Sequence, residues 1–117
     1  MKLKNLEMEL MLTILDSLLA HRDKVGYVAA RNTRILATAL TEYTKIKNDL
    51  IKEHGIVNDD GTAFINETCE GFDTVRNALN EIKDCEHEVD IMKLKYDEVI
   101  GILNGKEILQ LEFMLED

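Results

Sequence analysis

Apolar residues recur at helical spacing through the middle of the chain, and this pattern sets the predicted fold. From Tyr27 to His54 they fall at steps of three, four or seven residues, which places their side chains on one helical face. Neither Pro nor Gly occurs in this stretch, so the pattern predicts one long helix. Its apolar stripe consists of Val28, Ile35, Ala39, Tyr43, Ile46 and Leu50.

The end of this helix is predicted at Gly55, because Gly adopts the left-handed conformation at a helix C-terminus without a Cβ clash. A helix from Tyr27 to His54 would be roughly 42 Å long at the usual rise per residue. This length exceeds the diameter that a domain of 117 residues needs. We therefore expect an elongated molecule.

A first helix is predicted from Leu3 to His21, and its residues are apolar on nearly every side. A surface helix of a small domain needs only one apolar face, so this helix either lies at the centre of the fold or docks on another chain. We expect this helix to dock on a second copy of the chain. Methionine suits an adaptable interface, although it more often fills gaps in a core. The residues predicted to make an apolar contact are Leu3, Met8, Met11 and Leu12.

Further stretches complete the predicted fold. Residues 56–66 place β-favouring residues on both sides of an Asn-Asp-Asp-Gly sequence, which is typical of a β-hairpin. A helix over residues 67–86 is predicted to return antiparallel to the long helix. Residues 87–96 then alternate in polarity, which indicates a strand that could join the hairpin. A short last helix is predicted over residues 106–115.

Together these elements predict a single, mainly α domain over residues 1–117. The N-terminal helix lies across an antiparallel pair of long helices, and a small β-hairpin or strand element lies at one end. A chain of this length is large enough for one hydrophobic core and too small for two.

The charge balance narrows the range of partners. The formal net charge is −9, which opposes nucleic acid at long range, so no nucleic-acid partner is expected. No uncharged run of eighteen residues exists and the first residues lack a signal-peptide pattern, so no membrane partner is expected. Cys69 and Cys85 lie about 24 Å apart if they share one helix, which predicts free thiols and a reducing compartment.

A local basic cluster stands out in this acidic chain. Arg22, Arg31 and Arg34, together with Lys24, fall around the corner between the first two predicted helices. The three arginines are predicted to contact a phosphate or an acidic partner. The alternative is that they form internal ion pairs or a solvated helix face, as surface charges usually do.

No arrangement of residues points to catalysis, so we predict a protein without enzymatic activity, cofactor or metal. His21, His54 and His87 lack the spacing of metal ligands. Cys85 lies near His87, but residues two positions apart on a helix point in different directions. An EF-hand alignment that starts at Ile56 lacks the aspartate that opens the calcium loop.

Four stretches carry a resemblance to a known family. In chain order they read ARNTR (30–34), GIVNDDGTAFIN (55–66), EHEVDIMKL (86–94) and LQLEFMLED (109–117). Their order and spacing resemble an uncharacterised family of short, mainly helical proteins from phages and prophages, over residues 25–117. The resemblance implies a phage or prophage origin and a location in the cytoplasm of a bacterial host, with the virion as an alternative. No catalytic residue comes with it, since the family has no established activity.

Three functions compete on this basis. The leading one is a non-enzymatic interaction protein of a phage or prophage, structural or accessory to assembly, which acts through helical surfaces and forms a homo-oligomer. The second is an acidic, host-directed inhibitor of a defence or nucleic-acid-handling enzyme, and it rests on the net charge alone. The third is a metal or small-ligand binder that uses carboxylates such as Asp59, Asp60, Glu67 and Glu70.

Overall fold

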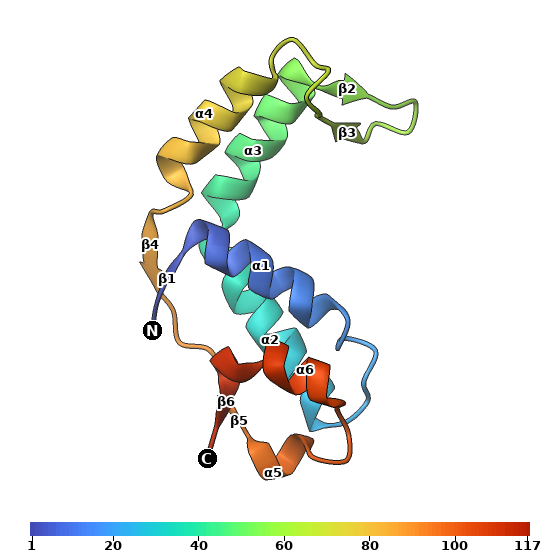
Figure 1. The fold of residues 1–117 in the computed structure, drawn as a ribbon, viewed down its shortest axis with the longest axis vertical. Helices are drawn as coiled ribbons and strands as arrows, with labels where there is room; N and C mark the ends of the chain where they lie inside the picture. Colours follow the sequence, from blue (N-terminus) through green and yellow to red (C-terminus); the bar gives the residue numbers. More distant parts are fainter.

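The computed structural model describes all residues, 1–117, and shows a mainly helical fold with small β pairs, as predicted (Figure 1). The helices are α1 (Asn5–Asp16), α2 (Lys24–Ala39), α3 (Thr41–His54), α4 (Phe72–Ile82), α5 (Tyr96–Val99) and α6 (Gly105–Gln110), with a 3-10 turn at Glu112–Met114. The strands are β1 (Lys2–Lys4), β2 (Ile56–Val57), β3 (Ala63–Phe64), β4 (Glu86–Glu88), β5 (Leu94–Lys95) and β6 (Leu115–Glu116).

The molecule is elongated, as expected, with principal extents of 50 × 31 × 22 Å. Two parts follow one another along the long axis in Figure 1. We call residues 41–85 the arm, which holds α3, α4 and the β2–β3 hairpin. Residues 1–40 and 86–117 form the body, which holds α1, α2 and the C-terminal elements.

The single long helix predicted from Tyr27 to His54 is wrong, because the chain bends at Leu40. This residue has φ −91° and ψ 5°, so α2 ends before it and α3 begins after it. The hydroxyl of Thr41 donates to the carbonyl oxygen of Thr38 at 2.8 Å, a type of bond that bends helices. As a result α3 leaves the body in a new direction (Figure 1).

The body contains the hydrophobic core. Helix α1 packs on α2, and the C-terminal segment covers the same helices. Leu94 and Leu115 pair across the parallel β5–β6 ladder and both are buried, so the chain end closes the core. The buried hydrophobic residues of the body are Leu3, Met8, Leu15, Leu18, Val25, Val28, Ala29, Leu36, Leu40, Val89, Ile91, Leu94, Val99, Leu103, Leu111, Met114 and Leu115.

A buried amide attaches the C-terminal segment to α2. Asn32 is fully buried, and its Nδ2 donates to the carbonyl oxygen of Met92 at 2.9 Å. Its Oδ1 accepts from the backbone N–H of Met92 at 2.7 Å. The side chain therefore pairs with both backbone groups of one residue, which satisfies polar groups that would be costly to bury alone.

The arm is thin by comparison. Helices α3 and α4 run antiparallel, as predicted for a helical pair, and the hairpin connects them (Figure 1). Gly61 at the hairpin turn has φ 88°, the left-handed conformation that the turn requires. Only Tyr43 and Val75 are buried in the arm.

Two details of the predicted connections are also wrong. Gly55 ends α3 in an extended conformation, φ −98° and ψ −163°; a Cβ there would lie 2.3 Å from the carbonyl oxygen of Phe64, so close packing requires this glycine. Strand β4 does not join the hairpin. It pairs antiparallel with β1, Leu3 opposite His87, because the segment after α4 returns to the body instead of the arm tip.

None of the helices combines the length and the apolar character that crossing a bilayer requires.

Candidate binding groove

A groove of about 360 Å³ lies where α4 packs beside α3 and the first half of α1. Three helices contribute to it, two from the arm and one from the body, together with Ile65 after β3. The residues that line it are Leu6, Glu9, Tyr43, Lys47, Ile65, Phe72, Val75, Arg76, Leu79, Asn80 and Lys83.

Helix α4 presents one face to this groove along its whole length. Its lining residues recur at steps of three and four, the spacing of a single helical face. This face has two edges of different character. Val75 is buried and Leu79 is half-buried on the apolar edge. The other edge is polar and consists of Arg76, Asn80 and Lys83.

The opposite wall joins the body to the arm. The carboxylate of Glu9 on α1 pairs with the ammonium of Lys47 on α3 at 2.7 Å, and each side chain is about one-third exposed. Tyr43 lies beside this pair. Burial raises the pKa of its phenol, the Glu9 carboxylate raises it further, and Lys47 lowers it.

An apolar surface continues from the groove along α1. Leu6 lines the groove and is 39% exposed, and Leu10, one turn further along the same face, is 58% exposed. These two residues are the outward part of a helix whose other face packs on α2. They extend the groove into a larger apolar surface without a partner in the chain.

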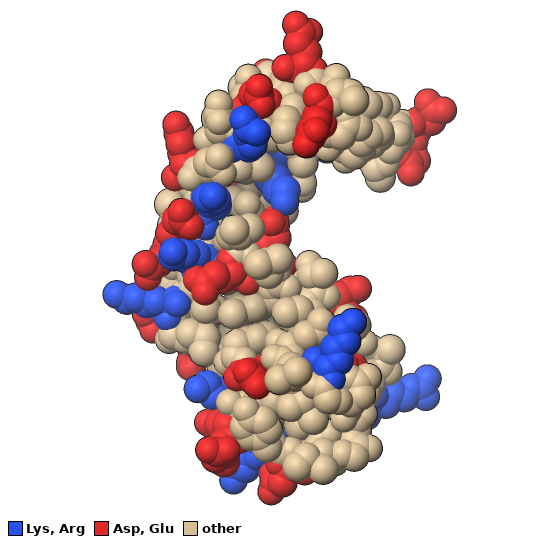
Figure 2. Space-filling view, in the orientation of Figure 1, with Lys and Arg blue, Asp and Glu red and all other residues tan.

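The groove has a local charge that the rest of the arm lacks. The arm contains ten acidic and five basic residues, yet three of the basic residues, Lys47, Arg76 and Lys83, line the groove and none of the acidic residues of the arm does. Glu9, from the body, is the one carboxylate in the lining. Figure 2 shows Lys and Arg side chains over the α3 and α4 part of the molecule, among acidic ones.

Arg76 and Lys83 differ in how firmly they are held. The guanidinium of Arg76 pairs with Asp73 at 3.0 Å and lies 5.8 Å from the ring centroid of Phe72. Lys83 makes no ion pair. Both cations lie on the same edge of the helix. Lys83 is free to pair with an anionic group that enters the groove, whereas Arg76 shares its charge with Asp73.

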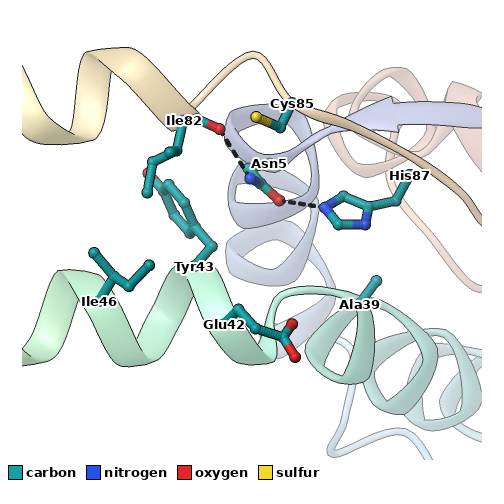
Figure 3. A pocket seen from close by; sticks show the side chains of 8 residues that line it. All are labelled: Asn5, Ala39, Glu42, Tyr43, Ile46, Ile82, Cys85 and His87. Atoms are coloured by element: carbon teal, nitrogen blue, oxygen red, sulfur yellow. Dashed lines mark hydrogen bonds between the residues drawn. The ribbon is translucent and has the colours of Figure 1, made fainter.

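A second, smaller hollow of about 150 Å³ shares Tyr43 with the groove (Figure 3). Asn5 is buried in its wall, where its Nδ2 donates to the carbonyl oxygen of Ile82 at 2.9 Å. Its Oδ1 is then the acceptor for the Nε2–H of His87, also at 2.9 Å. This arrangement attaches α1 to the segment that follows α4, which is a structural role for both polar side chains.

Cys85 and His87 both line this smaller hollow, so the prediction that they point in different directions is wrong. That prediction assumed a helix, whereas the chain is extended here, and alternate residues of extended chain share a face. No hydrogen bond joins the two side chains, and Nε2 of His87 is bonded to Asn5. The hollow holds no paired nucleophile and base.

The exposure predicted for the apolar contact residues of α1 and β1 is wrong in part. Leu3 and Met8 are 5% and 0% exposed and belong to the core. Met11 and Leu12 are partly buried and pack against it. The sequence pattern was apolar on nearly every side of this helix, so it did not decide which face would turn inward. The outward residues are Leu6 and Leu10.

The predicted basic residues are all at the surface. Arg22, Arg31 and Arg34 are exposed and make no ion pair with an acidic side chain. Lys24 instead pairs with Glu98. The arginines lie outside both hollows, so their predicted contact with a partner stays a prediction.

In the acidic loop of the hairpin, the Asp60 carboxylate makes hydrogen bonds within the loop. Asp60 accepts from the hydroxyl of Thr62 at 2.6 Å and from its backbone N–H at 3.0 Å, and these bonds lower the pKa of the Asp60 carboxyl. No group of three or more His, Cys, Asp or Glu side chains is placed to hold a metal ion.

Comparison of this chain with protein-family models, with curated proteins and with solved structures gave no match.

Proposed function

We propose that this chain is a non-enzymatic interaction protein of phage or prophage type, structural or accessory to assembly. It acts through helical surfaces in the cytoplasm of a bacterial host, and a place in the virion is the variant of this proposal. The observation that carries it is the apolar surface formed by the groove together with Leu6 and Leu10. Adjacent exposed apolar side chains beside a groove are typical of a protein-binding surface.

Self-association is part of the proposal. The exposed face of α1 is available to a second copy as well as to another protein, because the chain itself leaves Leu10 uncovered. Sedimentation of the wild-type chain and of Leu10→Glu measures this. A homo-oligomer that becomes monomeric on substitution supports self-association through α1, and a wild-type monomer at every concentration contradicts it.

The partner is identified by cross-linking in cells. A photo-reactive phenylalanine replaces Leu10 while the phage or induced prophage that encodes the chain is replicating, and captured proteins are identified by mass spectrometry. The expected products are structural or assembly proteins of that phage. The matched control places the same residue at Lys45, whose side chain is 79% exposed and lines neither hollow.

Two results would count against the proposal. Capture of a host enzyme alone would favour the host-directed inhibitor. An identical set of products from Leu10 and Lys45 would mean that the α1 surface has no specific partner. The inhibitor stays the weaker candidate because it rests on net charge, and acidic and basic side chains are interspersed on the face that Figure 2 shows.

A further inference from the structure

We infer that the groove between α1, α3 and α4 binds an amphipathic helix of a partner protein, with apolar residues on one face and carboxylates along one edge. The inference rests on the proposed function and names the chemistry of the partner. It depends on three properties of the groove: its length, the separation of its apolar and polar edges, and its local charge.

The length of the groove suits a helix of about three turns. The lining residues of α4 and its C-terminal cap run from Phe72 to Lys83, which is about 16 Å along the helix axis. A helix that docks in a groove contributes side chains at steps of three and four, and a helix of this length presents such a set. A small ligand would be enclosed on most sides, whereas this groove follows the helix as a trench between α1, α3 and α4.

The two edges set how such a helix lies. Phe72, Val75 and Leu79 offer apolar surface for one face of the helix. On the polar edge, Arg76 and Lys83 are separated by seven residues, which is about 10 Å along α4. Two carboxylates seven residues apart on the bound helix therefore match them.

The net charge of the chain and the local charge of the groove also restrict the composition of the partner helix. The chain has a net charge of −9, so a strongly acidic protein is repelled at long range. Of the three cations that line the groove, Lys47 is paired with Glu9 and Arg76 with Asp73. Lys83 has no such partner, so it is the cation that most attracts a carboxylate entering the groove. The partner segment therefore carries a few carboxylates on one edge, rather than a long acidic run.

The test uses a displayed library of three-turn helical peptides in which the apolar face and the edge residues are randomised among apolar, Glu, Gln and Lys. The full-length chain is the bait. The expected binders have apolar residues at steps of three and four and Glu seven residues apart on one edge. Enrichment of Lys on that edge, or of no helical pattern, overturns the inference.

A matched pair of double variants locates the binding. Arg76→Gln with Lys83→Gln removes the cations of the polar edge, and Lys45→Gln with Lys52→Gln removes two exposed cations from α3. Both doubles change the net charge equally, and in each one an ion pair within the helix is lost. The first double weakens binding of the selected peptide about fivefold, and the second less than about twofold.

A peptide with Gln at both Glu positions completes the cycle. It should bind wild-type protein and the Arg76→Gln/Lys83→Gln variant equally, because the paired charges are gone from one side. If both double variants weaken binding of the selected peptide equally, the inference is contradicted, because the effect then comes from the net charge of the chain and not from the groove. So does a wild-type chain that sediments as a dimer and that the peptide dissociates, because a second copy would then occupy the groove.

The outcome is separate from that of the proposed function. A groove that selects acidic amphipathic helices, in a chain that captures no phage protein in cells, keeps the inference and rejects the function. The reverse result keeps the function and moves its surface away from α4. A titration in which dodecanoate, and no peptide, shifts the amide signals of α4 assigns the groove to a small amphiphile and overturns the inference.

Discussion

The arm and the body are built from similar helices but differ in what holds them. All but two of the 22 buried residues belong to the body, where α1, α2 and the C-terminal segment surround a shared core. The arm buries only Tyr43 and Val75. Elements with few buried contacts open at lower free energy than the core. The difference indicates that the arm opens more readily than the body, while the exposed Leu6 and Leu10 of the body lie beside it.

The largest effect is expected from Leu36→Ala in α2. Leu36 is fully buried in the core of the body, and truncating a buried leucine costs about 3 kcal/mol in the free energy of unfolding. Urea denaturation should show this loss for the whole molecule. Leu109→Ala is the control, because Leu109 is 70% exposed and its truncation should cost less than about 0.5 kcal/mol. Similar losses for both variants would mean that α2 is not the centre of the body.

A somewhat smaller loss is expected from Asn32→Ala. The substitution leaves both backbone groups of Met92 without their partner, at a cost of about 2 kcal/mol. Urea denaturation measures it, and hydrogen exchange at the Met92 amide should rise. Asn77→Ala on the exposed part of α4 is the control and should be nearly neutral. Unchanged exchange at Met92 would contradict the assigned role of the buried amide.

In the arm, Val75→Ala should act locally. The lost contacts cost about 1.5 kcal/mol, which corresponds to about a tenfold increase in the opened fraction of the arm. Limited proteolysis with thermolysin measures this opened fraction. Cleavage within residues 41–85 should become faster, while cleavage of the body should stay unchanged. Val57→Ala in the hairpin makes the same change at a residue that is 56% exposed, and should alter cleavage less than about twofold. Faster cleavage of the body as well would show that the two parts open together.

The smallest effect is expected at the junction, from the ionisation of Tyr43. Its pKa is raised above the ordinary value of 10.0 by burial and by Glu9, so the folded state favours the neutral phenol. The associated stability is fully present below about pH 10 and is lost as the pH rises through the raised pKa. Urea midpoints should therefore fall more steeply above pH 10 for wild type than for Tyr43→Phe. Tyr27→Phe, at a residue 60% exposed, should keep the wild-type slope.

Much of the local structure follows from the sequence, because helical and hairpin patterns are local. The antiparallel helix pair and the hairpin turn at Gly61 were predicted on this basis and are present. The bend at Leu40 was not predicted, since the apolar stripe continues through it and neither Pro nor Gly marks it. The bend depends on the bond of Thr41 to the preceding turn and on the packing of Leu40 in the body.

The groove could not be predicted from the sequence, for a different reason. It depends on contacts between residues far apart in the chain, such as Asn5 with Ile82 and Glu9 with Lys47. Helix α1 is apolar on nearly every side, so its pattern could not show that Met8 faces inward and Leu10 outward. The one available signal was the regular spacing of Arg76 and Lys83 on the face of α4 that carries Val75 and Leu79, and it gains meaning only once α1 is in place.

Native-state hydrogen exchange of the free chain tests the central claim, that the arm has little buried core of its own and opens more readily than the body. Amides in the middle of α2, such as that of Asn32, should exchange only by global unfolding. Amides in the middle of α3 and α4 should exchange through local opening, at free energies at least about 2 kcal/mol lower. Equal protection of all three helices would contradict the claim, because the arm would then be as fully supported as the body.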